Sequence, residues 1–202
     1  PRRAPQRERQ PEIGRGGAWG DYDNDGMLDV FFTALQYYGN DSELFRNTGS
    51  PGAPQFSEVS LPASVEGYSV SWADWDNDGD MDLATGSPNR FFRNDNNNGN
   101  SWLKVALRAP GARGVNGAAI GAIARVRAGD LIVTRQVEAG TGQGNQADAT
   151  MHFGLGDYAG EVTLEILWPG NRKQTLRTPI DRQVTVSFEP LLSVNLSAFT
   201  LR

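Results

Sequence analysis

Apolar and polar residues alternate with a period of two along several segments in the second half of the chain. The apolar residues that share a face are Leu103, Val105 and Leu107; Val162, Leu164, Ile166 and Trp168; and Val184, Val186 and Phe188. In the first of these segments Lys104 and Arg108 fall on the opposite face. Such alternation predicts half-buried strands with one face in water.

Turn residues separate these strands at hairpin length. AGD occupies residues 128–130 and PGN occupies residues 169–171, each between two alternating segments. Connections of two or three residues that contain glycine are typical of β-hairpins. We therefore predict that residues 99–190 form a β-sandwich.

The first half also predicts strands, because its apolar runs are short. LDVFFTAL and MDLATG are bounded by Asn, Asp, Gly and Pro, which is typical of strands joined by polar turns. Helical signals are scarce from Gly17 onward. The fold class predicted for the chain is all-β.

A thirteen-residue pattern occurs twice in this half. AWGDYDNDGMLDV, residues 18–30, and SWADWDNDGDMDL, residues 71–83, are identical at seven of thirteen positions at an offset of 53 residues. The tripeptide FRN follows each copy, at residues 45–47 and 92–94. A repeat of about 50 residues has the size of a propeller blade. Residues 17–98 are therefore predicted to form two propeller-like blades.

Each copy concentrates carboxylates around a glycine, and we call the two segments the first and second Asp loops. The carboxylates are Asp21, Asp23, Asp25 and Asp29 in the first loop and Asp74, Asp76, Asp78 and Asp82 in the second. In the order D-x-D-x-D-G, alternate carboxylates converge when the chain wraps around a centre. A hard cation that takes six to eight oxygens at about 2.3–2.6 Å suits such a shell. We predict one calcium ion in each loop.

The remaining ligands follow from the turn that each loop must make. Glycine occupies the sharp turn without a Cβ penalty, and the next residue, Met27 or Asp80, would offer its backbone carbonyl. Counted from Asp21 or Asp74 as position one, position twelve of the loop is Phe32 in the first copy and Thr85 in the second. An EF-hand has a bidentate Glu at that position. Magnesium keeps more of its water, and zinc and copper would need Cys or His. The alternative interpretation is a pair of ordinary Asp/Asn/Gly turns without metal.

Charge and composition narrow the class of partner. The 202 residues carry a net charge of -5 with a pI near 4.9, which argues against nucleic acid. No run approaches the roughly 18 apolar residues of a membrane-spanning helix. The segment at 1–16 holds five arginines against two glutamates, which predicts a basic extended arm that could order against an acidic partner. Residues 191–202 are predicted to be a C-terminal tail.

The Asp loops, with their tryptophans and the trailing FRN, resemble FG-GAP/VCBS calcium-binding repeats. The segments NGNSWLKVAL, GAAIGAIARVRAGD and HFGLGDYAGEVTLEILWPGNRKQTL resemble the ASPIC/UnbV domain that follows such repeats in cartilage-acidic-protein-like chains. The resemblance covers residues 17–190. It implies calcium-binding propeller blades and an extracytoplasmic location, periplasmic or secreted. Two units cannot close a propeller ring of at least four blades.

Catalytic candidates are few, and we predict no enzymatic activity. His152 is the single histidine, no cysteine is present, and no G-x-S-x-G elbow supplies a nucleophile. His152 lies between Met151 and Phe153 at the end of a predicted strand, which favours a structural role. The glycine runs at 140–146 and 154–160 lack nucleotide-loop spacing and are predicted to be turns.

Two functions agree with these features. The first is a non-catalytic, calcium-stabilised module that binds a protein partner in a larger extracytoplasmic or membrane-associated assembly, because unpaired blade edges invite pairing with another chain. The second is a polysaccharide-binding module or enzyme appendage in which exposed Trp and Tyr stack on a glycan. If the arm at 1–16 crosses a partner, its deletion should weaken association and reduce the salt sensitivity of that association.

Overall fold

The computed structural model describes residues 14–34, 42–61, 65, 67–86, 89–96, 98–110, 114–140 and 148–188. Every regular secondary-structure element in these ranges is a β-strand. The strands form four sheets, and none of these sheets closes into a barrel. The predicted all-β fold is therefore confirmed. Within the same ranges no helix has the length and apolar character needed to cross a bilayer. The predicted tail at 191–202 lies outside these ranges, as does the arm except for residues 14–16.

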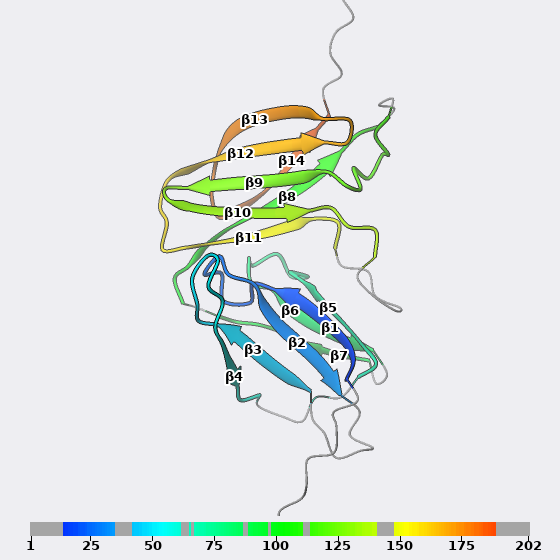
Figure 1. Ribbon diagram of the computed structural model, residues 1–202, viewed down its shortest axis with the longest axis vertical. Coiled ribbons are helices and arrows are strands. Elements are labelled where there is room, and N and C mark those ends of the chain that lie inside the picture. The colour runs from blue at the N-terminus through cyan, green and yellow to red at the C-terminus, as the bar shows by residue number, and fades with distance from the viewer. Residues whose placement is uncertain are drawn as a thin grey trace, which may run out of the picture.

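Two antiparallel sheets form the first half of the structure, and we call them blade 1 and blade 2 (Figure 1). Blade 1 contains β1 (Gly14–Gly20), β2 (Asp29–Ala34), β3 (Glu43–Asn47) and β4 (Phe56–Val59). Blade 2 contains β5 (Ser69–Ala73), β6 (Asp82–Gly86) and β7 (Arg90–Phe92). An Asp loop joins the first two strands of each blade, so both loops emerge at corresponding ends. This arrangement agrees with the predicted two-blade partial propeller.

The blades pack face to face through a small apolar core. Trp72 of blade 2 meets Phe31 of blade 1 edge to face, with ring centroids 6.4 Å apart. The Trp72 indole also donates a hydrogen bond to the carbonyl of Ala18 across the interface, at 3.2 Å. Val70 and Leu83 complete the buried contribution of blade 2.

The second half is a two-sheet sandwich, as predicted. Its strands are β8 (Ser101–Arg108), β9 (Ile123–Ala128), β10 (Leu131–Gln136), β11 (Met151–Gly156), β12 (Glu161–Trp168), β13 (Arg172–Pro179) and β14 (Arg182–Ser187). One sheet has the order β10-β9-β12-β13 and the other has the order β11-β8-β14. All strand pairs are antiparallel except β8 with β14, which is parallel.

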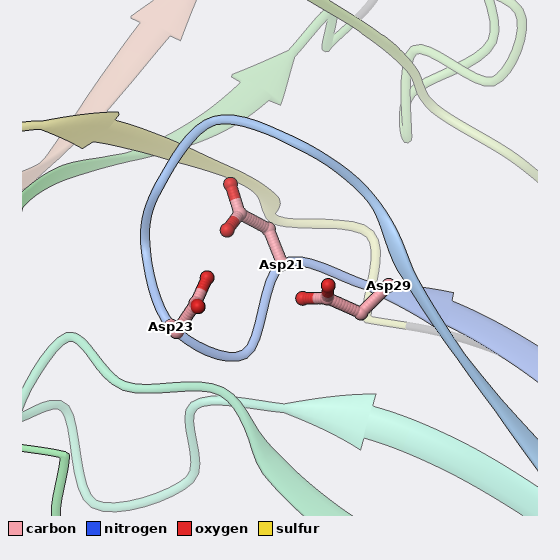
Figure 2. Close-up of side chains that lie close together, drawn as sticks. All are labelled: Asp21, Asp23 and Asp29. Carbon is pink, nitrogen blue, oxygen red and sulfur yellow. The ribbon is translucent and has the colours of Figure 1, made fainter. Parts of the chain in front are cut away.

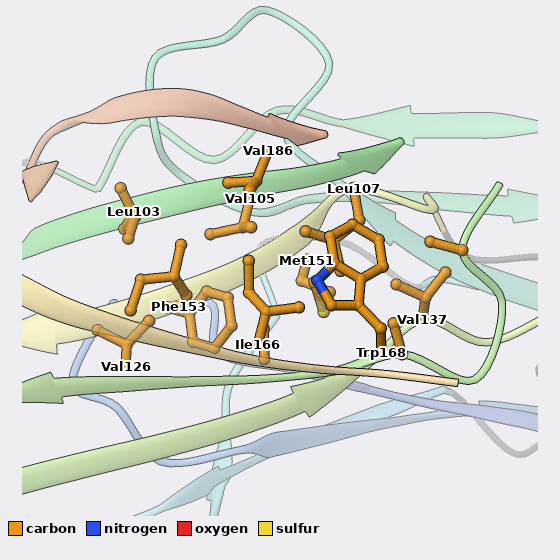
Figure 3. Close-up of a cluster of buried hydrophobic side chains, with 14 of the residues drawn as sticks. Leu103, Val105, Leu107, Val126, Val137, Met151, Phe153, Ile166, Trp168 and Val186 are labelled. Carbon is orange, nitrogen blue, oxygen red and sulfur yellow. The ribbon is translucent and has the colours of Figure 1, made fainter. Parts of the chain in front are cut away.

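The alternating residues predicted from the sequence form the sandwich core (Figure 3). Val162, Leu164, Ile166 and Trp168 are all at most 2% exposed. Trp168 packs edge to face on Phe188, with centroids 5.2 Å apart. The turns at 128–130 and 169–171 connect β9 to β10 and β12 to β13, as predicted.

One part of the strand prediction is wrong. Lys104 was expected on a wet face of β8 but is 4% exposed, and Ala106 on the same face is 5% exposed. The reason is tertiary, because the Lys104 side chain reaches the second Asp loop, where its Nζ donates to the Asp74 carbonyl at 3.2 Å and to Asn77 Oδ1 at 3.0 Å.

The core prediction can be tested by removing side-chain volume from one sheet. Ile166→Ala should lower the free energy of unfolding by about 2–5 kcal/mol, because it removes buried methyl groups and leaves a cavity. Ile132→Ala is the matched control, since Ile132 is 48% exposed; it should cost less than about 1 kcal/mol. Urea unfolding of both variants measures the difference, and equal losses would contradict the assignment of Ile166 to the core.

Candidate metal sites at the blade–sandwich interface

The two Asp loops have the same backbone conformation. Asn24 and Asn77, equivalent at the offset of 53 residues, have φ of 59° and 63°. Gly26 and Gly79 have φ of 91° and 99°, a region that L-residues with a Cβ rarely adopt. The glycine predicted at the sharp turn is therefore required there in both copies.

The first aspartate of each loop closes this turn. Asp21 Oδ2 accepts a hydrogen bond from the Gly26 amide at 3.0 Å, and Asp74 Oδ2 accepts one from the Gly79 amide at 3.1 Å. The other oxygen of each carboxylate, Oδ1, is buried and has no hydrogen-bond partner in the described part of the chain. A buried carboxylate oxygen without a partner is energetically costly, so a cation ligated there would relieve the cost.

Three carboxylates converge in each loop. Asp21, Asp23 and Asp29 each place an oxygen within 4.8 Å of the others in the first loop (Figure 2). In the second loop the converging set is Asp74, Asp76 and Asp78. Either cluster could bind a metal ion. The first is buried, whereas Asp76 and Asp78 of the second are exposed.

The other predicted ligands make contacts within and between the loops. Asp25 Oδ1 accepts from the Met27 amide at 2.8 Å, and Asp80 Oδ1 accepts from the Asn24 side chain of the other loop at 2.9 Å. Asp82 accepts from the amides of Asn94 and Trp75 at 2.8 and 3.2 Å. Asp25, Asp80 and Asp82 are not members of the converging sets found among the described residues.

Asp29 and Asp82, the ninth residues counted from the first aspartate of each loop, connect the loops to their FRN tripeptides through hydrogen bonds. Asp29 Oδ1 accepts from the Asn47 amide at 2.7 Å and its Oδ2 accepts from the Tyr22 amide at 3.1 Å. The same two bonds recur at Asp82 in the second copy. The carboxylate at position nine thus anchors the strand that follows the loop, and Asp29 does so while it also faces the cluster.

The arginine of each FRN neutralises the centre of its own loop. Arg46 forms ion pairs with Asp23 and Asp25, the latter at 3.5 Å. Arg93 forms ion pairs with Asp76 at 3.1 Å and with Asp78 at 3.5 Å. These guanidinium groups are half exposed, so each pair contributes modestly to stability.

The sandwich provides a cation to the first aspartate of each loop. Lys104 of β8 lies 3.0 Å from Asp74 Oδ2, and both side chains are at most 5% exposed. Arg135 of β10 lies 3.9 Å from Asp21 Oδ2, and its Nη2 has no hydrogen-bond partner among the described residues. Buried carboxylates are thereby paired across the blade–sandwich boundary, where a lone charge would be strongly destabilising.

The HFGLG segment forms the surface on which the loops rest. The Gly156 amide donates to the Asn24 carbonyl at 2.8 Å. An ideal Cβ at Gly154 would lie 2.2 Å from Asp21 Oδ2 and 2.6 Å from the Asn24 backbone. Glycine at position 154 allows the first loop to approach β11 directly.

His152 of the same segment reaches the second loop. Its Nε2 lies 2.9 Å from the Gly79 carbonyl and donates to it. Burial lowers the pKa of the imidazole to about 4, so the ring is neutral at physiological pH. This geometry agrees with the structural role predicted from the sequence.

A cavity of about 410 Å³ lies where the innermost blade strands β1 and β5 meet the sandwich. Trp19 and Trp72 line it from the blades, and Lys104, Arg135 and His152 line it from the sandwich. The interface is therefore incompletely filled next to both Asp loops, and apolar and charged side chains line it together.

Sequence reasoning missed the basic residues at this interface. Lys104 occupies a polar position of an alternating strand, which predicts exposure to water. Arg135 lies in LIVTRQ and belongs to no repeated or regularly spaced motif. Arg46 and Arg93 could have been found, because they repeat in FRN behind each acidic cluster. Their pairing with the loops became visible only in three dimensions.

Burial raises the pKa of the Asp21 carboxyl to about 8, while the Arg135 guanidinium opposes the shift and the neighbouring aspartates add to it. Burial likewise raises the pKa of Asp29 to about 7, partly offset by the Asn47 amide. These raised pKa values describe the chain without metal, in which desolvation disfavours the ionised carboxylates. A bound cation would reverse this preference.

Comparison with known proteins agrees with this two-part architecture. The family model for the FG-GAP-like repeat matches residues 21–85, which contain both Asp loops. The family model for ASPIC and UnbV matches residues 112–190, which contain HFGLG and most of the sandwich. The resemblance inferred from the motifs is confirmed.

Similar curated proteins share one name. Cartilage acidic protein 1 of Mus musculus is 29% identical over 165 residues, and the protein of that name from Xenopus tropicalis is 27% identical over 164 residues. Each match covers 75% of this chain and 25% of the relative. The chain thus spans about a quarter of the length of the relatives it matches.

The contact between HFGLG and the first Asp loop can be tested with one added methyl group. Gly154→Ala should lower the melting temperature by several degrees, because the methyl has no room beside Asp21 and Asn24. Gly117→Ala is the matched control, since no atom lies within 4 Å of its ideal Cβ. Equal melting temperatures for the two variants would contradict the close approach.

The raised carboxyl pKa values predict the pH dependence of the chain without metal. With folded values of about 8 for Asp21 and about 7 for Asp29 against an ordinary 3.8, the folded state binds more protons than the unfolded state. Stability should therefore fall as the pH rises from 5 to 8. Thermal unfolding in chelator across this range measures the slope, and Asp21→Asn should flatten it. A slope of opposite sign would contradict the burial of these carboxyls.

Proposed function

We propose that this chain is a non-catalytic, calcium-stabilised protein-interaction module that works outside the cytoplasm, in the periplasm or after secretion, as an accessory part of a larger assembly. The observation that carries the proposal is the placement of both Asp loops at the contact between the blades and the sandwich. A cation bound there would stabilise the loops and the arrangement of the two halves together.

Calcium fits the donor set of each loop. The first loop offers oxygens of Asp21, Asp23 and Asp29, and the second offers oxygens of Asp74, Asp76 and Asp78. Oxygen donors without nitrogen or sulfur suit a hard cation. The unpartnered Oδ1 atoms of Asp21, Asp23 and Asp74 support ligation at these clusters. A bound ion would supply charge neutralisation and rigidity.

Protein binding is the role that the surface supports. Large aromatic side chains lie exposed on the blades, with Trp19 at 59%, Trp75 at 60% and Phe91 at 73%. Among the described strands, the outer strands β4 and β7 each pair on one side only. Exposed apolar surface and open strand edges are features of interaction sites. The similarity to proteins named cartilage acidic protein 1 supports the extracytoplasmic part of the proposal.

Polysaccharide binding is the second candidate function, and one observation favours it. Trp75 and Phe91 form an exposed aromatic pair with ring centroids 6.3 Å apart. Such rings could stack on a sugar face. Retention on an immobilised polysaccharide that is lost in Trp75→Ala would favour this candidate over protein binding.

The calcium proposal predicts two sites that can be removed separately. Isothermal titration with calcium should give two ions per chain, and Asp23→Asn or Asp76→Asn should each leave one. Calcium should also raise the melting temperature, because it binds the folded state only. Magnesium and zinc titrations establish the preference for calcium.

Asp130→Asn is the matched control for charge, since Asp130 lies exposed in the β9–β10 turn. It should keep both sites and the calcium-dependent stabilisation. No heat of calcium binding, or equal binding of zinc, would overturn the proposal.

A further inference from the structure

We infer that Asn24 of the first Asp loop is a positioning residue for the calcium site of the second loop, and that the two ions therefore bind with positive cooperativity. The inference rests on the calcium sites proposed above, and it adds a residue that belongs to neither predicted ligand set. Hydrogen bonds that cross from one loop to the other carry it.

The Asn24 side chain is enclosed and directed toward the second loop. Asn24 is 1% exposed, and its Nδ2 donates to the Gly79 carbonyl at 3.1 Å and to Asp80 Oδ1 at 2.9 Å. Its Oδ1 has no hydrogen-bond partner among the described residues. Within the described part of the chain, the hydrogen bonds of this side chain therefore lead only to the second loop.

The two acceptors lie at the turn that completes the second site. Gly79 makes the turn with a φ of 99°, and Asp80 is the residue predicted to offer its backbone carbonyl to the ion. Asp78, on the other side of Gly79, belongs to the converging set of the second loop. Asn24 thus holds the chain between a carboxylate of the cluster and the predicted carbonyl ligand.

The backbone around Asn24 is fixed by residues outside the first loop. The preceding carbonyl, that of Asp23, accepts hydrogen bonds from the side chains of Asn98 and Asn100, the latter at 2.8 Å. The carbonyl of Asn24 accepts one from the Gly156 amide at 2.8 Å. The side chain therefore extends toward the second loop from a backbone that is held on both sides.

Asn24 also lies between carboxylates of the first loop. Asp23 precedes it and belongs to the first converging set (Figure 2), and Asp25 follows it as a predicted ligand. Without an ion, like charge and desolvation disfavour the ionised carboxylates in this closed loop. An ion in the first loop therefore favours the arrangement in which Asn24 reaches the second loop. By linkage, an ion in the second loop must favour binding at the first by the same factor.

The equivalent asparagine of the second loop has a different partner. Asn77 has a φ of 63°, against 59° for Asn24, so the two residues share a backbone conformation. The Asn77 side chain is exposed, and its Oδ1 accepts a hydrogen bond from Lys104 of the sandwich at 3.0 Å. Asn77 is therefore the matched control for a change at Asn24.

The test measures cooperativity as a ratio of calcium association constants. Chelator-competition titration of the unmodified chain gives the overall constant for two ions. Asp76→Asn and Asp23→Asn, which each remove one site, give the constants of the first and the second site alone. The overall constant divided by the product of these two constants is the coupling factor. Changes in the intrinsic affinity of either site cancel in this ratio.

The coupling factor of the unmodified chain should be about fivefold or more, as is typical of coupled sites. Asn24→Gly tolerates the positive φ but lacks the side-chain amide, so in the same three backgrounds it should bring the factor to about one. Asn77→Gly should leave the factor unchanged. Asp80→Ala removes one acceptor of Asn24 while it keeps the backbone carbonyl, and it should lower the factor as well.

Circular dichroism at saturating calcium verifies that each variant folds, and Asp80→Ala keeps the test decisive if Asn24→Gly does not fold. A factor that survives in both Asn24→Gly and Asp80→Ala would overturn the inference. An equal loss in Asn77→Gly would also overturn it, because the effect would then belong to the loop backbone rather than to the contact between the loops.

The same titrations separate this inference from the proposed function. Two ions that bind the unmodified chain independently would overturn the role of Asn24 alone and leave the calcium proposal intact. No calcium binding by the unmodified chain would overturn the calcium proposal, and the inference with it.

Discussion

The central constraint on this structure is the burial of like charges. Asp21, Asp23 and Asp29 are at most 4% exposed and lie within one short loop. Carboxylates leave water only when they are protonated, paired or ligated. Amides within each loop, the arginines of FRN and basic residues of the sandwich all serve this requirement. The contact between the two halves of the structure is organised around it.

The sandwich participates directly in the Asp loops. Lys104 and Arg135 provide charge, while Gly154 and Gly156 provide close backbone contact. Because these contacts cross the boundary, a change at either loop affects the arrangement of the two halves. The side chain of Asn24 also donates to the Gly79 carbonyl at 3.1 Å, so the two loops are coupled to each other.

The internal repeat has a different consequence for each copy. Trp72 and Trp19 occupy equivalent positions, yet the first is buried between blades and the second faces outward. The second Asp loop also differs from the first, because its cluster uses Asp78 rather than the position-nine carboxylate. Equivalent sequences thus acquire different environments from what packs beside them.

The sequence alone determined the strands, the turns and the two Asp loops, because alternation, glycine placement and repeated carboxylates act over short distances. Val162 to Trp168 and the loop glycines illustrate this local control. Only the tertiary structure decided that Lys104 is buried, that Arg135 lies beside Asp21, and that Asp25, Asp80 and Asp82 lie outside the converging sets. These outcomes depend on contacts between residues far apart in the chain, and local periodicity carries no information about which distant element will lie against a given face.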